Sequence, residues 1–469
     1  MKLSKIAIAT ASVCGVLSSP AFAIPATAFD NTVVHVRVSG ATALDPGLLE
    51  AVLKICQLGT LNRYGASNQA VFFCLADGTK ITLANGTKLA VYKHSVGGSG
   101  NGVQPIADGS ALPFLDLGNA GFAALYTATT VVTSAGGFSY NDSTITSAGL
   151  TANTVAKIGI SDLEPAFFGN VTVGNLATLA SEALGTVIFG VPVTRNVYEA
   201  LQLAQSKVVG SLIETNMPTL NTPQLTTLYT QAGQQWNAAT RGQITIPVDD
   251  TIYVARRADT SGTQKTFEAL FARSPNGLLG KSINNGSDGL TPDTFSSGSD
   301  AGNNTVANTL INQGDLTINN SGSSQVVFSL NRFQALGKGA VGTLSADSII
   351  STTGPANSTT PSDNIRYVKL NNVAPTIANV INGSYSYYGD AALNTKNLDT
   401  GLPVPGGTST IERLFYTALK QQFALFPAVQ PWGNTGTVTL NEVTGGTTGN
   451  PWSRQKAGVL NNGQQARLF

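Results

Sequence analysis

One segment, Arg256–Gln264, gathers the residue types that hold a small oxyanion. The guanidinium of Arg257 offers paired N–H donors to a tetrahedral anion. Ser261 and Thr263 add hydroxyl groups, and Gly262 lets the backbone approach a ligand closely. The helix that we expect to follow directs its free N–H groups and positive end to the same place. Taken alone, the segment fits an ordinary helix cap with solvated arginines equally well.

Two earlier turns offer further donors. Ser39–Ala43 leads from a predicted strand into a predicted helix, with the Thr42 hydroxyl and the Ala43 N–H at its end. Gly97–Gly102 supplies the Ser99 hydroxyl and a series of backbone N–H groups. It lacks the Lys-Ser/Thr ending of a nucleotide-binding P-loop, which disfavours nucleotide hydrolysis. Each turn on its own is more simply explained as an ordinary turn.

Asp162 would be an acceptor among these donors. It lies in Lys157–Pro165, where a short apolar run ends in Ser161-Asp162. Monobasic and dibasic phosphate carry a hydrogen that a carboxylate accepts, whereas ionised sulfate carries none and is repelled. A helix cap or a salt bridge is the structural alternative for Asp162. The three donor turns and this acceptor together predict a site selective for a protonated oxyanion.

Strands that run into helices through small-residue turns should position these groups. The runs 33–38, 88–92 and 251–255 are rich in β-forming residues, and each is followed by a turn and a helical pattern. This alternation predicts α/β lobes with mainly parallel sheets. Ligands of such sheets bind at the carboxyl ends of strands, where all three turns lie.

The first 23 residues have the order of a secretory signal peptide. Lys2 and Lys5 precede the apolar run Ile6–Leu17, and Ala21-Phe22-Ala23 has the small-x-small form of a cleavage site. We expect cleavage after Ala23 and a periplasmic or extracellular protein; a buried N-terminal helix is the alternative. No later stretch has the 18 or so unbroken apolar residues of a membrane span.

The charge balance argues against nucleic acid as a partner. Charged residues make up 11% of the chain, and removal of residues 1–23 leaves 25 basic and 26 acidic side chains. That balance provides no basic surplus for a phosphate backbone. One small anion needs only one or two well-placed charges, so near-neutrality is compatible with such a ligand.

Cysteine and histidine are scarce. An exported chain whose mature part holds only Cys56 and Cys74 predicts one disulfide between them. His35 and His94 are the only histidines, so zinc chemistry and histidine-based catalysis both lack residues. We therefore expect no cofactor, no metal and no catalytic residues.

The four segments, in this order, resemble the periplasmic phosphate-binding proteins of ABC transporters and the wider type 2 periplasmic-binding-protein superfamily. The matching motifs are Gly40-Ala41-Thr42, Gly98-Ser99-Gly100 after Tyr92, Ser161-Asp162, and Arg257-Ala258-Asp259-Thr260-Ser261-Gly262-Thr263. The last is the most specific. The family has a bulky residue where this chain has Ala43, and the similarity covers about Val33–Thr343 in patches.

The resemblance implies two α/β lobes joined by two crossover strands that close on a ligand, with Gly/Ser/Thr/Asn-rich insertions between the elements. Lobe one would comprise residues 24–192 and 345–469, and lobe two residues 193–344. The ligand-binding residues would be Thr42, Ala43, Ser99, Asp162, Arg257, Ser261, Gly262 and Thr263. Asp259 would orient Arg257. The implied partners are inorganic phosphate or a related oxyanion and an ABC permease, and we expect a monomer.

Three alternatives share these residues. The first is the same fold with a different oxyanion or a small organic ligand. The second is a secreted surface or matrix interaction protein, which the Thr/Gly/Asn-rich loops suggest. The third is an enzyme such as a secreted phosphatase, which the shortage of a metal cluster and of a nucleophile–histidine pair disfavours.

Overall fold

A computed structural model places most of the chain from residue 32 to residue 438. It describes residues 32–66, 68–119, 130–134, 136–145, 149–168, 177–230, 233–271, 294–295, 316–346, 350–351, 354–355, 365–396, 410–423 and 437–438. The predicted signal peptide and most of the low-complexity insertions lie outside these residues. Across the described ranges, no helix combines the length and the apolarity that crossing a membrane requires.

Single strands lead into helices in parts of the chain, and runs of consecutive strands separate these parts. The strands are β1 Val34–Gly40, β2 Asn62–Ala66, β3 Gln69–Leu75, β4 Lys88–His94, β5 Ala111–Leu115, β6 Thr130–Thr133, β7 Ser139–Thr144, β8 Thr151–Val155, β9 Ile158–Ser161, β10 Leu179–Thr194, β11 Thr219–Leu220, β12 Asp249–Arg257, β13 Thr294–Phe295, β14 Thr317–Asn320, β15 Lys338–Gly342, β16 Leu344–Ser345, β17 Ile350–Ser351, β18 Gly354–Pro355, β19 Ile365–Leu370, β20 Tyr388–Lys396 and β21 Thr437–Val438. The α-helices are α1 Asp45–Ile55, α2 Gln104–Asp108, α5 Arg195–Ala204, α6 Thr222–Thr230, α7 Trp236–Ala239, α8 Gly262–Phe271, α10 Ser323–Ala335, α11 Ile377–Ile381 and α12 Thr410–Phe423. The 3-10 turns are η2 Thr42–Leu44, η3 Gly98–Gly102, η4 Pro165–Phe167 and η5 Glu214–Asn216.

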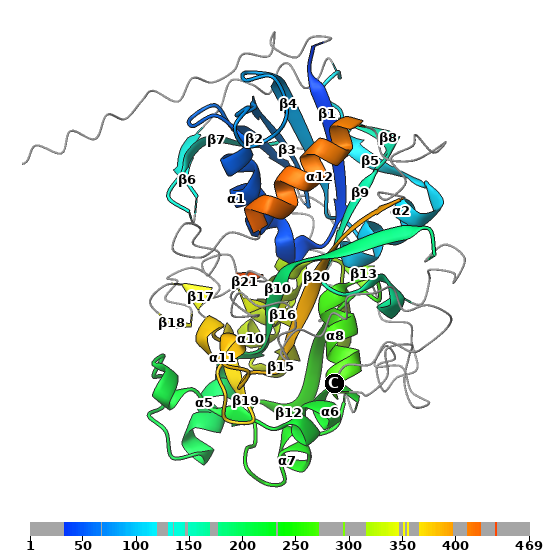
Figure 1. The fold of residues 1–469 in the computed structure, drawn as a ribbon. Helices are drawn as coiled ribbons and strands as arrows, with labels where there is room; N and C mark the ends of the chain where they lie inside the picture. Colours follow the sequence, from blue (N-terminus) through cyan, green and yellow to red (C-terminus); the bar gives the residue numbers. More distant parts are fainter. Residues whose placement is uncertain are drawn as a thin grey trace, which may run out of the picture.

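The upper lobe in Figure 1 is built on a mixed sheet in the order β6-β7-β2-β3-β4-β1-β9-β20-β10. Its centre, β4-β1-β9, is parallel, and antiparallel strands flank it. Helices α1 and α12 lie side by side over this sheet (Figure 1). Val36 and Val38, two residues apart on β1, are both fully buried, as the alternating pattern of the sequence predicts.

The lower lobe has a second sheet, in the order β13-β14-β12-β15-β10-β19-β11. Its centre, β14-β12-β15, is again parallel, and α5, α6, α7, α8 and α10 surround it (Figure 1). The two-lobed α/β fold that the sequence predicts is therefore confirmed, with a parallel core in each lobe.

Strand β10 belongs to both sheets. Its first ten residues pair with β20 in the upper sheet, and Val191–Thr194 pair with β19 in the lower one. The chain returns to the upper lobe through Tyr387 and β20, since Phe189 N donates to Tyr387 O at 3.1 Å. Strand β19 pairs within the lower sheet. We therefore propose that the chain re-enters the upper lobe near residue 388, and not at the lobe boundary expected at residue 345.

Backbone packing joins the ends of β1 and β9 to η3. The N–H of Ala41 donates to Ile160 O at 2.8 Å. A Cβ on Gly102 would overlap the backbone of Ile160, and one on Gly40, where φ is +109°, would come within 2.6 Å of Gly102 Cα. Only glycine permits this approach, so the turns after β1 and β4 meet beside the end of β9.

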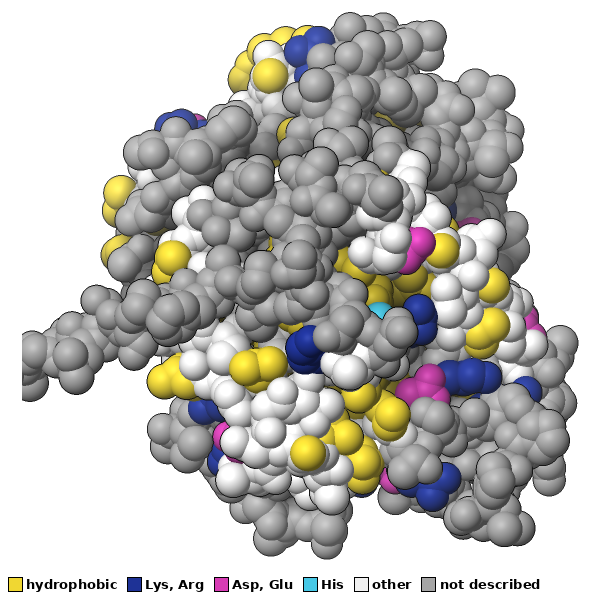
Figure 2. Space-filling model, turned by 90° about the horizontal axis from the view of Figure 1, so that it is seen from above, with side chains coloured by type: hydrophobic (Ala, Val, Ile, Leu, Met, Phe, Trp, Pro, Cys, Tyr) yellow, Lys and Arg dark blue, Asp and Glu magenta, His cyan; other side chains and the backbone are white. Residues whose placement is uncertain are grey.

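Charges are thinly spread over the molecule. The face seen from above in Figure 2 carries interspersed Lys/Arg and Asp/Glu side chains among uncharged polar and apolar ones. This agrees with the 11% charged composition of the sequence.

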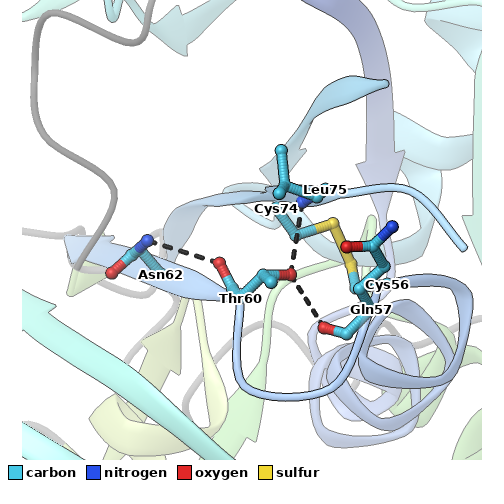
Figure 3. The surroundings of a disulfide bond; sticks show 6 residues. All are labelled: Cys56, Gln57, Thr60, Asn62, Cys74 and Leu75. Carbon is cyan, nitrogen blue, oxygen red and sulfur yellow. Dashed lines mark hydrogen bonds between the residues drawn. A yellow bond between two sulfur atoms is a disulfide. The ribbon is translucent and has the colours of Figure 1, made fainter. Parts of the chain in front are cut away.

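Cys56 and Cys74 form the predicted disulfide (Figure 3). It joins the end of α1 to β3 across a separation of 18 residues. The loop between them is held as well by Thr60, whose hydroxyl donates to Gln57 O at 2.7 Å and accepts from Leu75 N at 3.3 Å. The bridge thus fastens α1, which begins directly after the first donor turn, to the upper sheet.

Removal of this bridge should destabilise the upper lobe without changing its ligand site. We expect the Cys56→Ala/Cys74→Ala protein to lose about 3 kcal/mol of unfolding free energy, because closure of a loop of this length restricts the unfolded chain by about that amount. Urea unfolding of both proteins measures the difference. Equal midpoints and slopes would show that the bridge contributes nothing.

Candidate functional site

The candidate site lies where several strand ends meet. The turn after β4 carries Ser99, and Asp162 directly follows β9. Strand β12 ends at Arg257 and leads through a short turn into α8. Gly262 forms the contact between them, since a Cβ there would lie 2.6 Å from both Asp162 Cβ and Ser99 Oγ. The structure therefore brings together Ser99, Asp162 and Gly262 from opposite lobes.

Arg257 is the central cation of this cluster. Its side chain is 1% exposed, and its guanidinium donates to Ser323 Oγ at 3.1 Å and Ser321 O at 3.2 Å. Nε has no hydrogen-bond partner among the described residues. Burial lowers the pKa of Arg257 to about 10, and the charges of Asp162 and Tyr387 oppose that shift. Arg257 is therefore charged at neutral pH although it is out of contact with solvent.

The arginine that pairs with Asp259 is Arg256 and not Arg257. Asp259 forms an ion pair with Arg256 through Nη2, and Arg256 also donates to Arg257 O at 2.9 Å. The predicted orienting role of Asp259 is therefore corrected. Residues 256 and 257 face opposite sides of β12, so the carboxylate three residues later reaches the first arginine, while Ser321 and Ser323 hold the second.

The start of α8 presents two buried hydroxyls. Ser261 is 2% exposed and Thr263 is fully buried, and neither Oγ nor Oγ1 has a hydrogen-bond partner within the described part of the chain. The helix itself is in place, since Ser261 N donates to Ala258 O and Lys265 N to Ser261 O. Buried hydroxyls without partners are uncommon in folded proteins, so these two groups are available to a ligand.

Asp162 is the buried acceptor. It is 2% exposed, its backbone N–H donates to Ser99 Oγ at 3.0 Å, and its Oδ1 has no partner among the residues placed by the structure. Burial raises the pKa of Asp162 to about 6, while the hydrogen bond to Ser99 and the charges of Arg257 and Lys93 lower it. Asp162 is therefore ionised at neutral pH and protonated in mild acid.

Direct contacts hold the lobes closed around this cluster. Gly100 N in the upper lobe donates to Thr260 O in the lower lobe at 2.7 Å. Tyr387, on the crossover into β20, donates to Thr263 O at 3.4 Å and packs edge-on against Phe271 of α8. The start of α8 thus contacts both the upper lobe and a crossover strand.

Thr42 and Ala43 lie beside the cluster rather than in it. Both are in η2, and the Thr42 hydroxyl donates to Ser95 O at 3.3 Å. Among the described contacts, none joins either residue to Arg257, Ser261 or Asp162. Their predicted contact with a ligand stays a prediction.

The sequence analysis missed two groups that support the cluster. Ser323 begins α10, Ser321 lies two residues before it, and both hold Arg257. The signal was a fourth strand-turn-helix pattern, Thr317–Asn320 followed by Ser-Gly-Ser. Lys93 is the second. It is a buried lysine at the carboxyl end of β4, and its position one residue after the predicted strand was the available signal.

The histidines have structural partners. His35 Nδ1 lies 2.8 Å from the Tyr92 hydroxyl. His94 Nδ1 lies 3.1 Å from Pro113 O, and burial lowers the pKa of His94 to about 4. In the ranges that the structure covers, no group of three or more His, Cys, Asp or Glu residues could hold a metal ion.

Three solved structures illustrate what this chain is similar to. A putative phosphate ABC transporter substrate-binding protein with bound phosphate from Clostridium perfringens has 12% identity and a TM-score of 0.44, covering 87% of this chain and 100% of the other. An ABC-type phosphate transport receptor from Vibrio cholerae has 12% identity and a TM-score of 0.40, with 86% and 99% covered. PstS from Borrelia burgdorferi has 8% identity and a TM-score of 0.36, with 86% and 98% covered. No protein-family profile and no curated protein sequence matches the chain.

Gly262→Ala should prevent full closure of the lobes. The added Cβ would lie 2.6 Å from Asp162 Cβ and Ser99 Oγ, so the lobes must separate by several tenths of an ångström or more. We expect a larger radius of gyration by small-angle scattering, with no loss of helix because alanine favours α8. Gly118→Ala is the control, since its nearest atom is Asp116 Oδ1 at 3.3 Å. Identical scattering from Gly262→Ala and wild type would contradict the contact.

Asp162 should make stability depend on pH. Because its pKa is raised from 3.8 to about 6, its contribution to stability is complete below pH 3.8 and is lost as pH rises through 6. Asp162→Asn avoids this loss and should gain about 3 kcal/mol relative to wild type between pH 4 and pH 7. Urea unfolding of ligand-free protein across that range measures the gain.

Asp77→Asn provides a control of opposite sign. Hydrogen bonds from Thr79 lower the pKa of Asp77, so its contribution is present at neutral pH and is lost as pH falls. Parallel stability curves for wild type and Asp162→Asn would show that the carboxyl group of Asp162 is not perturbed.

Proposed function

We propose that this chain is an exported binding protein that captures inorganic phosphate or a similar oxyanion between its lobes and performs no reaction on it. The supporting observation is a set of buried polar atoms that have no hydrogen-bond partner among the described residues and belong to one cluster. They are Asp162 Oδ1, Arg257 Nε, Ser261 Oγ and Thr263 Oγ1. Each such atom costs about 1–3 kcal/mol if it remains unpaired, so a ligand that pairs all four is strongly favoured.

The charge of the cluster favours an anion. The guanidinium of Arg257 lies at the start of α10, because it donates to Ser321 and Ser323. It also lies near the start of α8: a Cβ placed on Gly98 would be within 4 Å of both Arg257 Nη2 and Ser261 Cα. Helix N-termini carry partial positive charge. One buried cation and two helix N-termini therefore face a single carboxylate, Asp162, and a small anion would balance them.

Asp162 favours an anion that keeps a hydrogen. At neutral pH its ionised carboxylate repels a fully deprotonated ion but accepts a hydrogen bond from a protonated one. Phosphate retains at least one hydrogen near neutral pH and sulfate does not. The proposed selectivity is therefore for phosphate over sulfate.

Closure completes the proposed mechanism. Ser99 and Asp162 would hold the anion from the upper lobe, while Arg257, Ser261, Thr263 and the N–H of Gly262 would hold it from the lower one. The contact from Gly100 to Thr260 then closes the lobes over it. Residues 1–23 would direct export, and an ABC permease would receive the ligand from a monomeric protein.

Calorimetric titration of the mature protein with phosphate and with sulfate tests this function. We expect phosphate to bind about 100-fold more tightly, because loss of one charge-assisted hydrogen bond together with repulsion amounts to about 3 kcal/mol. Asp162→Asn should reduce that ratio to near one. Failure to bind phosphate, or equal affinities in wild type, would refute the proposal.

Asp142→Asn is the matched control in the upper lobe. Asp142 pairs with Arg63 at 2.7 Å on strands β7 and β2. Its replacement should leave the ratio of affinities unchanged. A thermal unfolding curve for each variant establishes that it is folded.

A further inference from the structure

Lys93 is an unusual residue for the interior of this chain. Its side chain is 2% exposed, and Nζ lies 2.7 Å from Gly40 O, 2.6 Å from Ser95 Oγ and 3.0 Å from Asp45 Oδ1. Ala41 O lies 3.3 Å from Nζ as well, so the three N–H donors of the ammonium group have four acceptors within reach. Burial lowers the pKa of Lys93, and the charge and hydrogen bond of Asp45 oppose that shift, so the ion pair with Asp45 favours the charged ammonium form.

The partners of Lys93 lie on two different turns. Gly40 ends β1 and leads into η2, whereas Ser95 follows β4 and leads into η3, which carries Ser99. Ser95 Oγ also donates to both carboxylate oxygens of Asp45 at 2.8 Å. One ammonium group thus fixes the backbone of the first donor turn against the start of the second.

The charge of Lys93 also acts on Asp162. Burial raises the pKa of Asp162, Lys93 and Arg257 lower it, and Asp45 raises it. Burial raises the pKa of Tyr387, and among the described residues Asp162 raises it as well. Lys93 is on the same lobe as Asp162, so its influence does not depend on closure as that of Arg257 does.

We propose that Lys93 is a positioning residue of the anion site, which joins the first two donor turns and thereby holds Ser99 beside Asp162, the carboxylate that would accept the hydrogen of the ligand. This inference rests on the proposed function, because it concerns selectivity for a protonated oxyanion. Lys93 acts through Asp162 and the turns and does not touch the ligand. Without it, Asp162 would be protonated closer to neutral pH and would discriminate less between phosphate and sulfate.

Two variants with opposite expected effects test the electrostatic part. Lys93→Met removes a charge that lowers the pKa of Asp162, and Asp45→Asn removes one that raises it. The ratio of phosphate to sulfate affinity should rise with pH as Asp162 ionises. We expect its midpoint to move up by about one pH unit in Lys93→Met, a typical effect of one nearby charge, and down in Asp45→Asn. At pH 7 the ratio for Lys93→Met should fall by about tenfold.

If the two substitutions only damaged packing, the pH midpoints of the affinity ratio in Lys93→Met and Asp45→Asn would move in the same direction or stay unchanged. Either result would overturn the proposal. Lys88→Met is the control on the same strand, with no expected shift. In the Asp162→Asn background, Lys93→Met should not lower the ratio further. A further decrease there would show that Lys93 acts by another route.

A measurement in ligand-free protein separates this inference from the proposed function. The pH at which Asp162→Asn gains stability should be higher in the Lys93→Met background than in wild type, whether or not phosphate binds. Absence of phosphate binding in wild type would refute the proposed function, while the stability curves would still decide whether Lys93 controls Asp162. Superimposable curves in the two backgrounds would refute that control.

Discussion

The burial of Arg257 between the lobes is the constraint on which the site depends. Its guanidinium cannot leave water without partners, and the structure supplies neutral oxygens from Ser321 and Ser323 and a carboxylate, Asp162, from the opposite lobe. The parallel centre of the lower sheet makes this arrangement possible, because β12 and β14 end side by side and both lead into helices there. The fold therefore places a cation where two helix N-termini already favour an anion.

The upper lobe meets this cation through close backbone packing. The glycines at 40 and 102 allow the turns after β1 and β4 to lie against β9, which places Ser99 beside Asp162. Gly262 then lets α8 approach both residues. Larger side chains at these positions would separate the groups that must act together, so the geometry of the site depends on residues that carry no functional group.

Much of the fold was predictable because it depends on local patterns. The alternation in β1, β4 and β12 and the small-residue turns after them predicted the strand-turn-helix units, and two cysteines in a chain with a predicted signal peptide predicted the disulfide. Contacts between distant segments were not predictable in this way. Lys93 and Gly40 are 53 residues apart, and Ser323 reaches Arg257 across 66 residues from a segment that composition alone classes as a loop. The sequence also could not predict the partner of Asp259, because that partner depends on which face of β12 each arginine occupies. It could not predict the length of β10, because that length depends on pairing with both sheets.

The charged groups of the site are divided between the two lobes, and this division decides which of them would act on Asp162 before the lobes close. Lys93, Asp45 and Asp162 belong to the upper lobe, whereas Arg257 and the N-termini of α8 and α10 belong to the lower one. If the lobes separate as proposed, water would screen Arg257 from Asp162, whereas Lys93 and Asp45 would remain on the same lobe as Asp162. The upper lobe would then set the ionisation of its acceptor before closure, and the lower lobe would add its positive charge only as the lobes meet. An anion that Asp162 rejects would be opposed at the first encounter, so selection would precede closure.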